Sequence, residues 1–236
     1  MTAVERAVEL VKPGDRIGLG TGQAATAFAV ALAARVREGL TVHAVPTSDA
    51  TAARALDLGI PLTRLADIEA LDLTVDGADE VDPQLDLIKG YGGALLREKV
   101  VAMVSRRLVI LVGSEKLVPV LGTRGVLPIE VVPFALPLCL RRLADAGIPA
   151  SPRRAGDRLF VSDNGNHLLD CSVGPIEHPI DTLDEIRSIP GVVEVGLFLG
   201  LADVVIVDGG DRVDVLERRA GTRRAPLNLA LRECKS

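Results

Sequence analysis

Short apolar runs alternate with longer helical patterns along the first half of the chain. Apolar residues in short or alternating runs predict strands at 16–19, 40–45, 71–75 and 108–112. Helical patterns occupy the N-terminal residues, an alanine-rich segment that reaches Gly39, a segment closed by Gly59, and residues 94–106. This alternation predicts an α/β fold with a parallel sheet covered on both faces, whose ligands bind beyond the carboxyl ends of the strands.

The pattern changes where prolines become frequent, and we place a domain boundary near residues 122–128. Beyond it we expect a helix at about 135–146, a hairpin, a helix at about 182–188 and a strand at 192–198. The hairpin would join strands 158–162 and 167–172 through an Asn-Gly turn, the strongest short hairpin signal. Residues 126–202 would form a small α+β domain, while 1–125 and 203–236 form the main domain.

The composition narrows the classes of partner. Hydrophobic residues make up 48% of the 236 residues and aromatic residues only 2%, so the core must be aliphatic. Few aromatics and a formal net charge of −5 argue against a nucleic-acid partner. A protein that binds single-stranded nucleic acid uses aromatic side chains that stack on the bases and a basic surface. We expect the basic run at 218–224 to be solvated.

Cysteine and histidine spacing indicates neither a disulfide framework nor a metal site. The three cysteines are widely separated and lack CxxC spacing, and the three histidines share no ligand spacing. The N-terminal residues have no signal-peptide core, and no run of eighteen apolar residues suggests a membrane span. A reducing cytoplasm fits these features best.

A glycine-rich loop, Gly18-Leu19-Gly20-Thr21-Gly22-Gln23-Ala24, joins the first predicted strand to the alanine-rich helix. Small residues there let backbone amides approach an anion, although a tight turn without a ligand explains this loop equally well on its own. A dinucleotide fingerprint needs an acidic residue at the end of the next strand, but Pro46-Thr47-Ser48 stands there. No Gly-Lys pair occurs, which excludes a Walker P-loop.

Residues 71–104 hold most of the candidate chemistry. Asp76, Gly77, Ala78 and Asp79 follow a predicted strand, and Lys89 leads through Gly90, Tyr91, Gly92 and Gly93 into a helical pattern. The carboxylates could serve as Mg²⁺ ligands together with Glu80 and Asp82, although a solvated acidic turn or sugar-hydroxyl binding explains them as well. With the glycine loop, these segments meet at the carboxyl end of the predicted sheet.

Three consecutive charges, Arg97, Glu98 and Lys99, interrupt that helical pattern. At about 100° per residue they cannot share one face. Glu98 is the best candidate to point inward, because its neighbours three and four residues away are apolar. Such surroundings raise the pKa of a carboxylate, as a general base working near neutrality requires. A helix-end charge cluster bound for solvent or a partner chain is the alternative.

Several segments together resemble successive blocks of the type A ribose-5-phosphate isomerase family. They are GLGTG, TSDAT, TVDGADEVD, LIKGYGGALLREKVV, SEKLV, LPIEVVPFA, SDNGN and PGVVEVGLF, in the family's order. The resemblance implies a Rossmann-like domain, a smaller α+β domain that could lie at an oligomer interface, and a homodimer or homotetramer. It also implies interconversion of ribose 5-phosphate and ribulose 5-phosphate in the pentose phosphate pathway, without a metal or another cofactor.

The resemblance carries roles to individual residues. Glu98 would be the proton acceptor, Asp76 and Asp79 would bind the sugar and assist ring opening, and Lys89 would bind substrate. Which aspartate opens the ring stays open. Further substrate-binding residues would be Thr21, Gly22, Gln23, Ala24, Gly77, Ala78, Gly90, Tyr91, Gly92 and Lys116.

The chain departs from the family at Gln23-Ala24, where the family usually carries Ser-Thr. An amide and a methyl group replace two hydroxyl donors, although the Gln23 amide can also donate hydrogen bonds. Two other functions are considered: a non-catalytic sugar-phosphate sensor, which would not require Glu98, and an acyl-CoA transferase-like enzyme, which also uses a glutamate. Turnover of ribose 5-phosphate with EDTA present distinguishes them from a metal-free isomerase.

Overall fold

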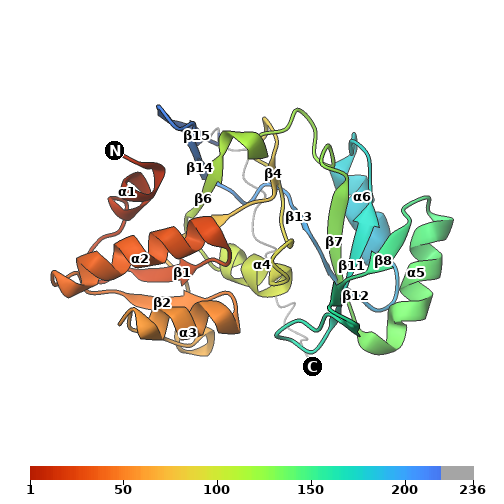
Figure 1. Cartoon of the computed structure of the whole chain (residues 1–236), viewed down its shortest axis with the longest axis horizontal. Coiled ribbons are helices and arrows are strands. Elements are labelled where there is room, and N and C mark those ends of the chain that lie inside the picture. Colours follow the sequence, from red (N-terminus) through yellow and green to blue (C-terminus); the bar gives the residue numbers. More distant parts are fainter. Residues whose placement is uncertain (219–236) are drawn as a thin grey trace, which may run out of the picture.

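A computed structural model of the chain describes residues 1–218. Its largest sheet has six strands in the order β15-β14-β6-β3-β1-β2 (Figure 1). The strands are β1 (Arg16–Leu19), β2 (His43–Pro46), β3 (Leu73–Gly77), β6 (Leu108–Gly113), β14 (Val204–Asp208) and β15 (Val213–Glu217). Neighbours pair in parallel except β14 with β15, so the predicted α/β class with a parallel sheet is confirmed.

Helices cover both faces of this sheet. The first four are α1 (Ala3–Val8), α2 (Gln23–Arg37), α3 (Asp49–Asp57) and α4 (Leu95–Met103). Phe28 of α2 packs with Ile17 and Val75 on one face. Because successive residues of a strand point to opposite faces, Gly18 faces α4 on the other side. A Cβ at Gly18 would lie 2.6 Å from Val101 Cγ1, so α4 packs closely only because residue 18 is glycine.

A second, antiparallel sheet has the strand order β12-β7-β11-β8. Its strands are β7 (Val126–Val131), β8 (Ala150–Pro152), β11 (His167–Ser172) and β12 (Val192–Val195). Cys139 and Leu143 of α5 (Leu136–Asp145), with Leu183 and Ile186 of α6 (Pro179–Arg187), share its core. Figure 1 shows α4 between the two sheets.

Short elements complete the described chain. A three-stranded sheet has the order β13-β5-β4 and contains β4 (Glu80–Val81), β5 (Leu87–Ile88) and β13 (Leu197–Phe198). The pair β9 (Arg154–Ala155) and β10 (Arg158–Leu159) forms a separate ribbon. Single turns of 3-10 helix are η1 (Leu65–Asp67), η2 (Ser114–Lys116) and η3 (Pro133–Ala135).

The predicted hairpin of strands 158–162 and 167–172 is wrong. Only an isolated bridge joins Val161 to His167, and β11 pairs instead with β7 and β8. The Asn-Gly turn is present, but Ser162, Asn164 and Asn166 direct their side chains to Glu130. Residues 158–159 pair locally with β9, so they do not extend alongside β11.

The predicted strand 192–198 is divided into β12 and β13, which belong to different sheets. The break falls at Gly196, whose amide donates to the Pro128 carbonyl and whose carbonyl accepts from the Lys89 amide. A Cβ at residue 196 would lie 3.0 Å from the Pro128 carbonyl oxygen, so glycine permits this close crossing.

Two further boundaries differ from the prediction. α4 ends at Met103, before residue 106, and α6 begins at Pro179, three residues before the predicted start. None of the helices within residues 1–218 has the length and apolar character that a membrane crossing needs. Arg218 begins the basic run at 218–224, and its guanidinium group donates to the carbonyls of Ala202 and Leu85 and pairs with Asp86, so the expectation of a solvated run is wrong at this residue. Residues 219–224 lie outside the described residues.

Candidate active site

Asp76 forms the floor of the site at the end of β3. Its side chain is buried, and Oδ1 accepts hydrogen bonds from the Thr21 amide (3.1 Å) and the Gly77 amide (2.7 Å). Gly20 passes directly over it, and a Cβ there would lie 2.6 Å from the Asp76 Cα atom. The glycine loop and this carboxylate therefore fix each other's positions.

Lys89 is a buried cation between two carboxylates. Its Nζ lies 3.0 Å from Asp76 Oδ2 and 3.4 Å from Glu98 Oε2, and it donates to the Gly77 carbonyl at 2.6 Å. Burial by itself lowers the pKa of Lys89, but the charges of Asp76 and Glu98 outweigh it and hold this pKa above its ordinary value. The ammonium group therefore stays charged at neutral pH.

Glu98 lies in the first turn of α4, and the prediction that it points inward is confirmed by its burial (4% exposed). Gly90 and Gly93, with φ of 113° and 87°, turn the chain into this helix in a conformation that favours glycine. Glu98 Oε2 has no hydrogen-bond partner among residues 1–218. Burial, reinforced by the charges of Asp76 and Asp79 and opposed by Lys89, raises the pKa of Glu98 to about 8.

Asp79 lies in the loop that follows β3. Its Oδ2 accepts a hydrogen bond from the Tyr91 amide at 3.0 Å. Burial raises the pKa of Asp79 above its ordinary value, while the Tyr91 amide, Lys89 and Lys116 oppose the shift. Asp79 is thus an aspartate that lines the cavity and takes up a proton more readily than a solvent-exposed aspartate does.

The N-terminus of α2 closes the other side of the site. Gly22 is its N-cap with φ of 104°, and no side chain caps the helix. Backbone amides at a helix start that lack side-chain acceptors favour an anion. The Thr21 hydroxyl group instead contacts those of Thr47 (2.8 Å) and Ser48 (2.9 Å), which tie the loop to α3.

These groups surround one cavity of about 310 Å³. The predicted residues that line it are Thr21, Gly22, Gln23, Ala24, Gly77, Ala78, Asp79, Lys89, Gly90, Gly92, Glu98 and Lys116. Asp76 lies beneath the cavity wall, where it holds Lys89. Tyr91 does not line the cavity: its hydroxyl group donates to the Val126 carbonyl at 3.4 Å.

A family model for ribose 5-phosphate isomerase A (phosphoriboisomerase A) matches residues 43–212. The chain belongs to this family. The enzyme is 51% identical over 214 residues to ribose-5-phosphate isomerase A of Roseiflexus sp. strain RS-1, covering 89% of this chain and 92% of the relative. It is 49% identical over 224 residues to that of Nitrobacter hamburgensis, covering 92% and 96%.

Solved structures agree with these relatives. A D-ribose-5-phosphate isomerase in complex with phospho-erythronic acid superposes with a TM-score of 0.88 at 36% identity, covering 92% of this chain and 96% of the other. Ribose 5-phosphate isomerase A of Methanocaldococcus jannaschii gives 0.87 at 39% identity with the same coverage. The enzyme therefore shares the fold of these two ribose-5-phosphate isomerases over 92% of its length.

Sequence reasoning missed four residues that line the cavity: Leu111, Val112, Gly113 and Glu115. They lie at or just beyond the end of β6, the strand next to β3 in the sheet. The signal that could have found them is their position, because Gly113-Ser114-Glu115 follows an apolar strand in the same way that Asp76 to Asp79 does.

The four acidic residues considered as Mg²⁺ ligands do not converge in the enzyme. Glu80 accepts from the Gly122 and Arg124 amides, and Asp82 Oδ1 accepts from the Gln84 and Asp86 amides. Asp76 pairs with Lys89 beneath the cavity wall, and Asp79 lines the cavity. Residues 1–218 contain no group of three or more His, Cys, Asp or Glu side chains placed to hold a metal ion.

Proposed function

We propose that the enzyme interconverts ribose 5-phosphate and ribulose 5-phosphate through an enediolate, with Glu98 as the general base. One observation carries this proposal. Glu98 is a buried carboxylate with a raised pKa, and its Oε2 has no hydrogen-bond partner among residues 1–218. It shares the cavity with Lys89, whose ammonium group lies 3.4 Å from this oxygen and stays protonated. Proton abstraction next to a carbonyl requires this pair of a base and a positive group that stabilises the oxyanion.

In the forward direction Glu98 takes the proton from C2 of the open-chain aldose. The electron pair of that bond forms the C1–C2 double bond, and the carbonyl oxygen on C1 becomes an oxyanion stabilised by Lys89. Glu98 then returns the proton to C1 while the C2 oxygen becomes the ketone and its proton passes to the C1 oxygen. Protons and electrons balance without a metal or a redox cofactor.

We assign the proton transfer of ring opening to Asp79. Its carboxylate lines the cavity, and burial raises its pKa, so it takes up a proton more readily than a solvent-exposed aspartate does. Asp76 accepts two amide hydrogen bonds and pairs with Lys89 below the cavity wall, so it serves to hold Lys89 in place.

The phosphate group would bind at the opposite side of the cavity, between the first amides of α2 and Lys116. Both groups line the cavity, and both favour an anion. A relative whose structure contains phospho-erythronic acid binds a phosphorylated sugar acid, which supports a phosphorylated sugar as the substrate here.

The test is turnover of ribose 5-phosphate by the purified enzyme with EDTA present. Glu98→Gln keeps the shape of the side chain but removes its basicity, so kcat should fall by about 10²- to 10⁴-fold. Glu69→Gln, at an exposed position outside the cavity, is the control and should keep the parent rate. Near-normal turnover by Glu98→Gln would remove the assignment of the base. Loss of parent turnover in EDTA would remove the metal-free mechanism.

We also propose that the enzyme is a cytoplasmic homo-oligomer. The proposed small domain, 126–202, carries a 94% exposed Phe134, with Val132 and Leu138 partly exposed beside it in the sequence. Exposed apolar side chains in a group are typical of subunit interfaces. Light scattering distinguishes a dimer from a tetramer, and a monomer would contradict the proposal.

A further inference from the structure

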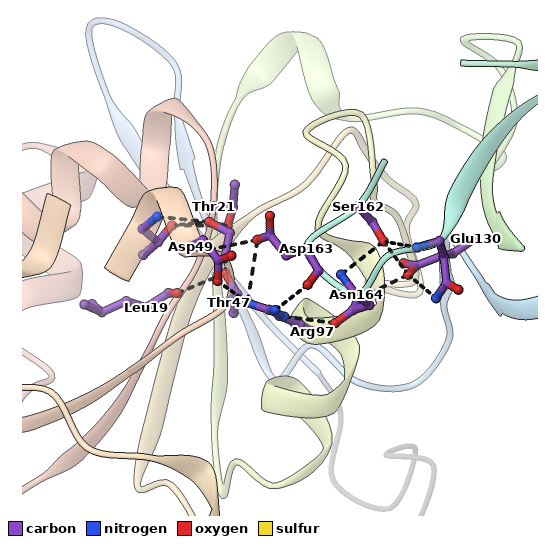
Figure 2. Close-up of polar contacts among 12 residues, drawn as sticks. Leu19, Thr21, Thr47, Asp49, Arg97, Glu130, Ser162, Asp163 and Asn164 are labelled. Atoms are coloured by element: carbon purple, nitrogen blue, oxygen red, sulfur yellow. Dashed lines mark hydrogen bonds and ion pairs between the residues drawn. The ribbon is translucent and has the colours of Figure 1, made fainter. Parts of the chain in front are cut away.

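A polar network joins the Asn-Gly turn to the two helices beside the cavity (Figure 2). We call it the Arg97 clamp and define it by six residues: Asp49, Arg97, Glu130, Ser162, Asp163 and Asn164. Arg97 immediately precedes Glu98 in α4, and Asp49 is the first residue of α3. The network therefore connects four segments that are far apart in the sequence: α3, α4, β7 and the turn.

Arg97 is the centre of the clamp. Its Nη1 lies 2.6 Å from Asp49 Oδ1, its Nη2 donates to the Asp163 carbonyl at 2.8 Å, and its Nε donates to Asn164 Oδ1 at 3.0 Å. A planar guanidinium group can hold several acceptors in fixed directions, whereas a lysine ammonium group cannot reproduce this fork. Arg97 thereby holds the first turn of α4 against both α3 and the turn.

Glu130 fixes the turn from behind. It is fully buried in β7, and its Oε1 accepts from Ser162 Oγ at 2.8 Å, Asn164 Nδ2 at 3.2 Å and Asn166 Nδ2 at 2.9 Å. Figure 2 shows this carboxylate on the side of the turn away from Arg97. The turn is thus a fixed support for Arg97.

The clamp also reaches the glycine loop. Asp163 Oδ2 accepts a hydrogen bond from the Asp49 amide at 2.8 Å. Asp49 follows Ser48, whose hydroxyl group contacts that of Thr21 at 2.9 Å, and Thr21 lines the cavity. Both walls of the cavity, that of Glu98 and that of Thr21, are therefore held to the same turn.

We propose that Arg97 is a positioning residue for the isomerisation, which sets the place of Glu98 relative to the glycine loop by binding the turn and α3 together. The proposal rests on Glu98 as the base. Arg97 contributes to geometry more than to stability, because Arg97, Asp49 and Asp163 are partly or largely exposed (34%, 74% and 34%) and ion pairs at such positions add little to stability. A small displacement of a reacting group is far more costly, at about 10²-fold in rate for 1 Å.

The first experiment measures kcat and KM for ribose 5-phosphate in Arg97→Ala. We expect kcat to fall by about 10- to 100-fold while thermal unfolding stays close to that of the parent. Arg97→Lys keeps a charge for Asp49 but not the fork, so it should recover part of kcat. The control is Arg64→Ala, which removes an exposed arginine bound to Asp67 through two hydrogen bonds and should keep the parent kcat.

A double-mutant cycle tests whether the turn and Arg97 act together. If they do, Asp163→Ala lowers kcat. The double variant with Arg97→Ala then has a kcat only slightly below that of the less active single variant. Additive losses would overturn the clamp. So would a folded Arg97→Ala variant with kcat within twofold of the parent.

The pH profile separates positioning from a general loss of folded protein. Glu98 is faced by Lys89 after β5, by Asp76 in β3 and by Asp79 in the loop after β3, while Glu115 and Lys116 line the same cavity. None of them is changed in Arg97→Ala. A displaced Glu98 gains contact with water, which reduces the effect of burial and lowers the pKa of this carboxyl group. The fall of kcat/KM on the acidic side of the profile should therefore move to lower pH. An unchanged limb would show a purely structural role. If Glu98→Gln is active, the base assignment itself fails; if it is inactive while Arg97→Ala is normal, only the clamp fails.

Discussion

Arg97, Glu98 and Lys99 leave α4 in three directions and meet three different environments. Arg97 binds the turn and α3, Glu98 faces the cavity, and Lys99 lies among backbone carbonyls and Glu194. The two cations donate to oxygen acceptors. Glu98 Oε2 has no hydrogen-bond partner among residues 1–218 and lies 3.4 Å from the Lys89 ammonium group, so this oxygen is an open acceptor held beside a cation.

The raised pKa of Glu98 predicts the pH dependence of the reaction. A base must be ionised to act, and this carboxyl group ionises as the pH rises through about 8. We therefore expect kcat/KM to fall about tenfold per pH unit below that value and to level off above it. Lys89 has a pKa above its ordinary value, so it should not produce a loss of activity below about pH 10.

The measurement is kcat/KM for ribose 5-phosphate between pH 5 and 10 at constant ionic strength. A phosphate monoester loses its second proton near pH 6. An acidic limb at about 6 would therefore belong to the substrate and contradict the raised pKa of Glu98. A limb near 8 that is absent from the residual activity of Glu98→Gln would assign it to this carboxylate.

Single side chains could be predicted from the sequence only where their surroundings are local. The inward direction of Glu98 followed from apolar neighbours within one helical turn. The burial of Lys99 could not be predicted, because its carboxylate partner Glu194 is 95 residues away. The contacts of Arg97 with residues 163 and 164 had no local signal for the same reason.

At the scale of elements, the N-terminus of α2 is where the chain departs from its family. Gln23 and Ala24 are the first two residues of this helix, and both line the cavity. Neither contributes a hydroxyl group, so the proposed phosphate site depends on the backbone amides, the Gln23 carboxamide and Lys116. A hydroxyl donor at each position would add hydrogen bonds to a charged group.

The double substitution Gln23→Ser with Ala24→Thr should lower KM for ribose 5-phosphate. Hydrogen bonds to charged groups contribute about 1.5–3 kcal/mol each. Part of this gain would replace hydrogen bonds that the Gln23 carboxamide would donate to the phosphate group, so we expect KM to decrease by about 3- to 10-fold. Unphosphorylated ribose, assayed in parallel, is the control and should show no change. An equal effect on both sugars, or a higher KM for the phosphorylated one, would show that these positions do not contact phosphate.

The regular elements of the large sheet could be predicted because each contains its own pattern. Strand β6 is a continuous apolar run, and α2 begins after a glycine loop. The hairpin prediction failed because the Asn-Gly turn is used for side-chain contacts with Glu130, which no local pattern reveals. The break at Gly196 depends on strands β5 and β7, which cross it from elsewhere in the chain.

At the scale of the whole molecule, Lys99 joins α4 to the chain where β12 leads into β13. Its Nζ donates to Glu194 Oε1 at 2.8 Å and to the carbonyls of Val195 and Leu197 at 2.6 and 2.9 Å. The ammonium group also lies 4.7 Å from the centre of the Phe198 ring, a favourable cation–π distance. Lys99 therefore binds α4, the helix that carries Glu98, to the four-stranded sheet through β12 and to the three-stranded sheet through β13.

Removing this cation should destabilise the fold more than removing Arg97. Burial alone would raise the pKa of Glu194, but Lys99, together with the Val195 amide and Arg187, outweighs it and holds this pKa below its ordinary value. A lowered carboxyl pKa adds stability that is present above the unfolded-state value of about 4.3 and is lost as the pH falls through the folded-state value. At pH 7 the contribution is complete, so the comparison belongs there.

At pH 7, Lys99→Met should lower the free energy of unfolding by about 3 kcal/mol. This value is at the lower end of the cost of breaking a buried ion pair, because Arg187 still binds Glu194 in the variant. Urea denaturation measures it, and Arg212→Met, which removes an exposed pair with Asp214, should change stability by no more than about 0.5 kcal/mol. The double variant Lys99→Met with Glu194→Gln should be less unstable than the sum of its single variants, since no unpaired charge remains. A loss below about 0.5 kcal/mol in Lys99→Met would show that α4 is held by its apolar contacts alone.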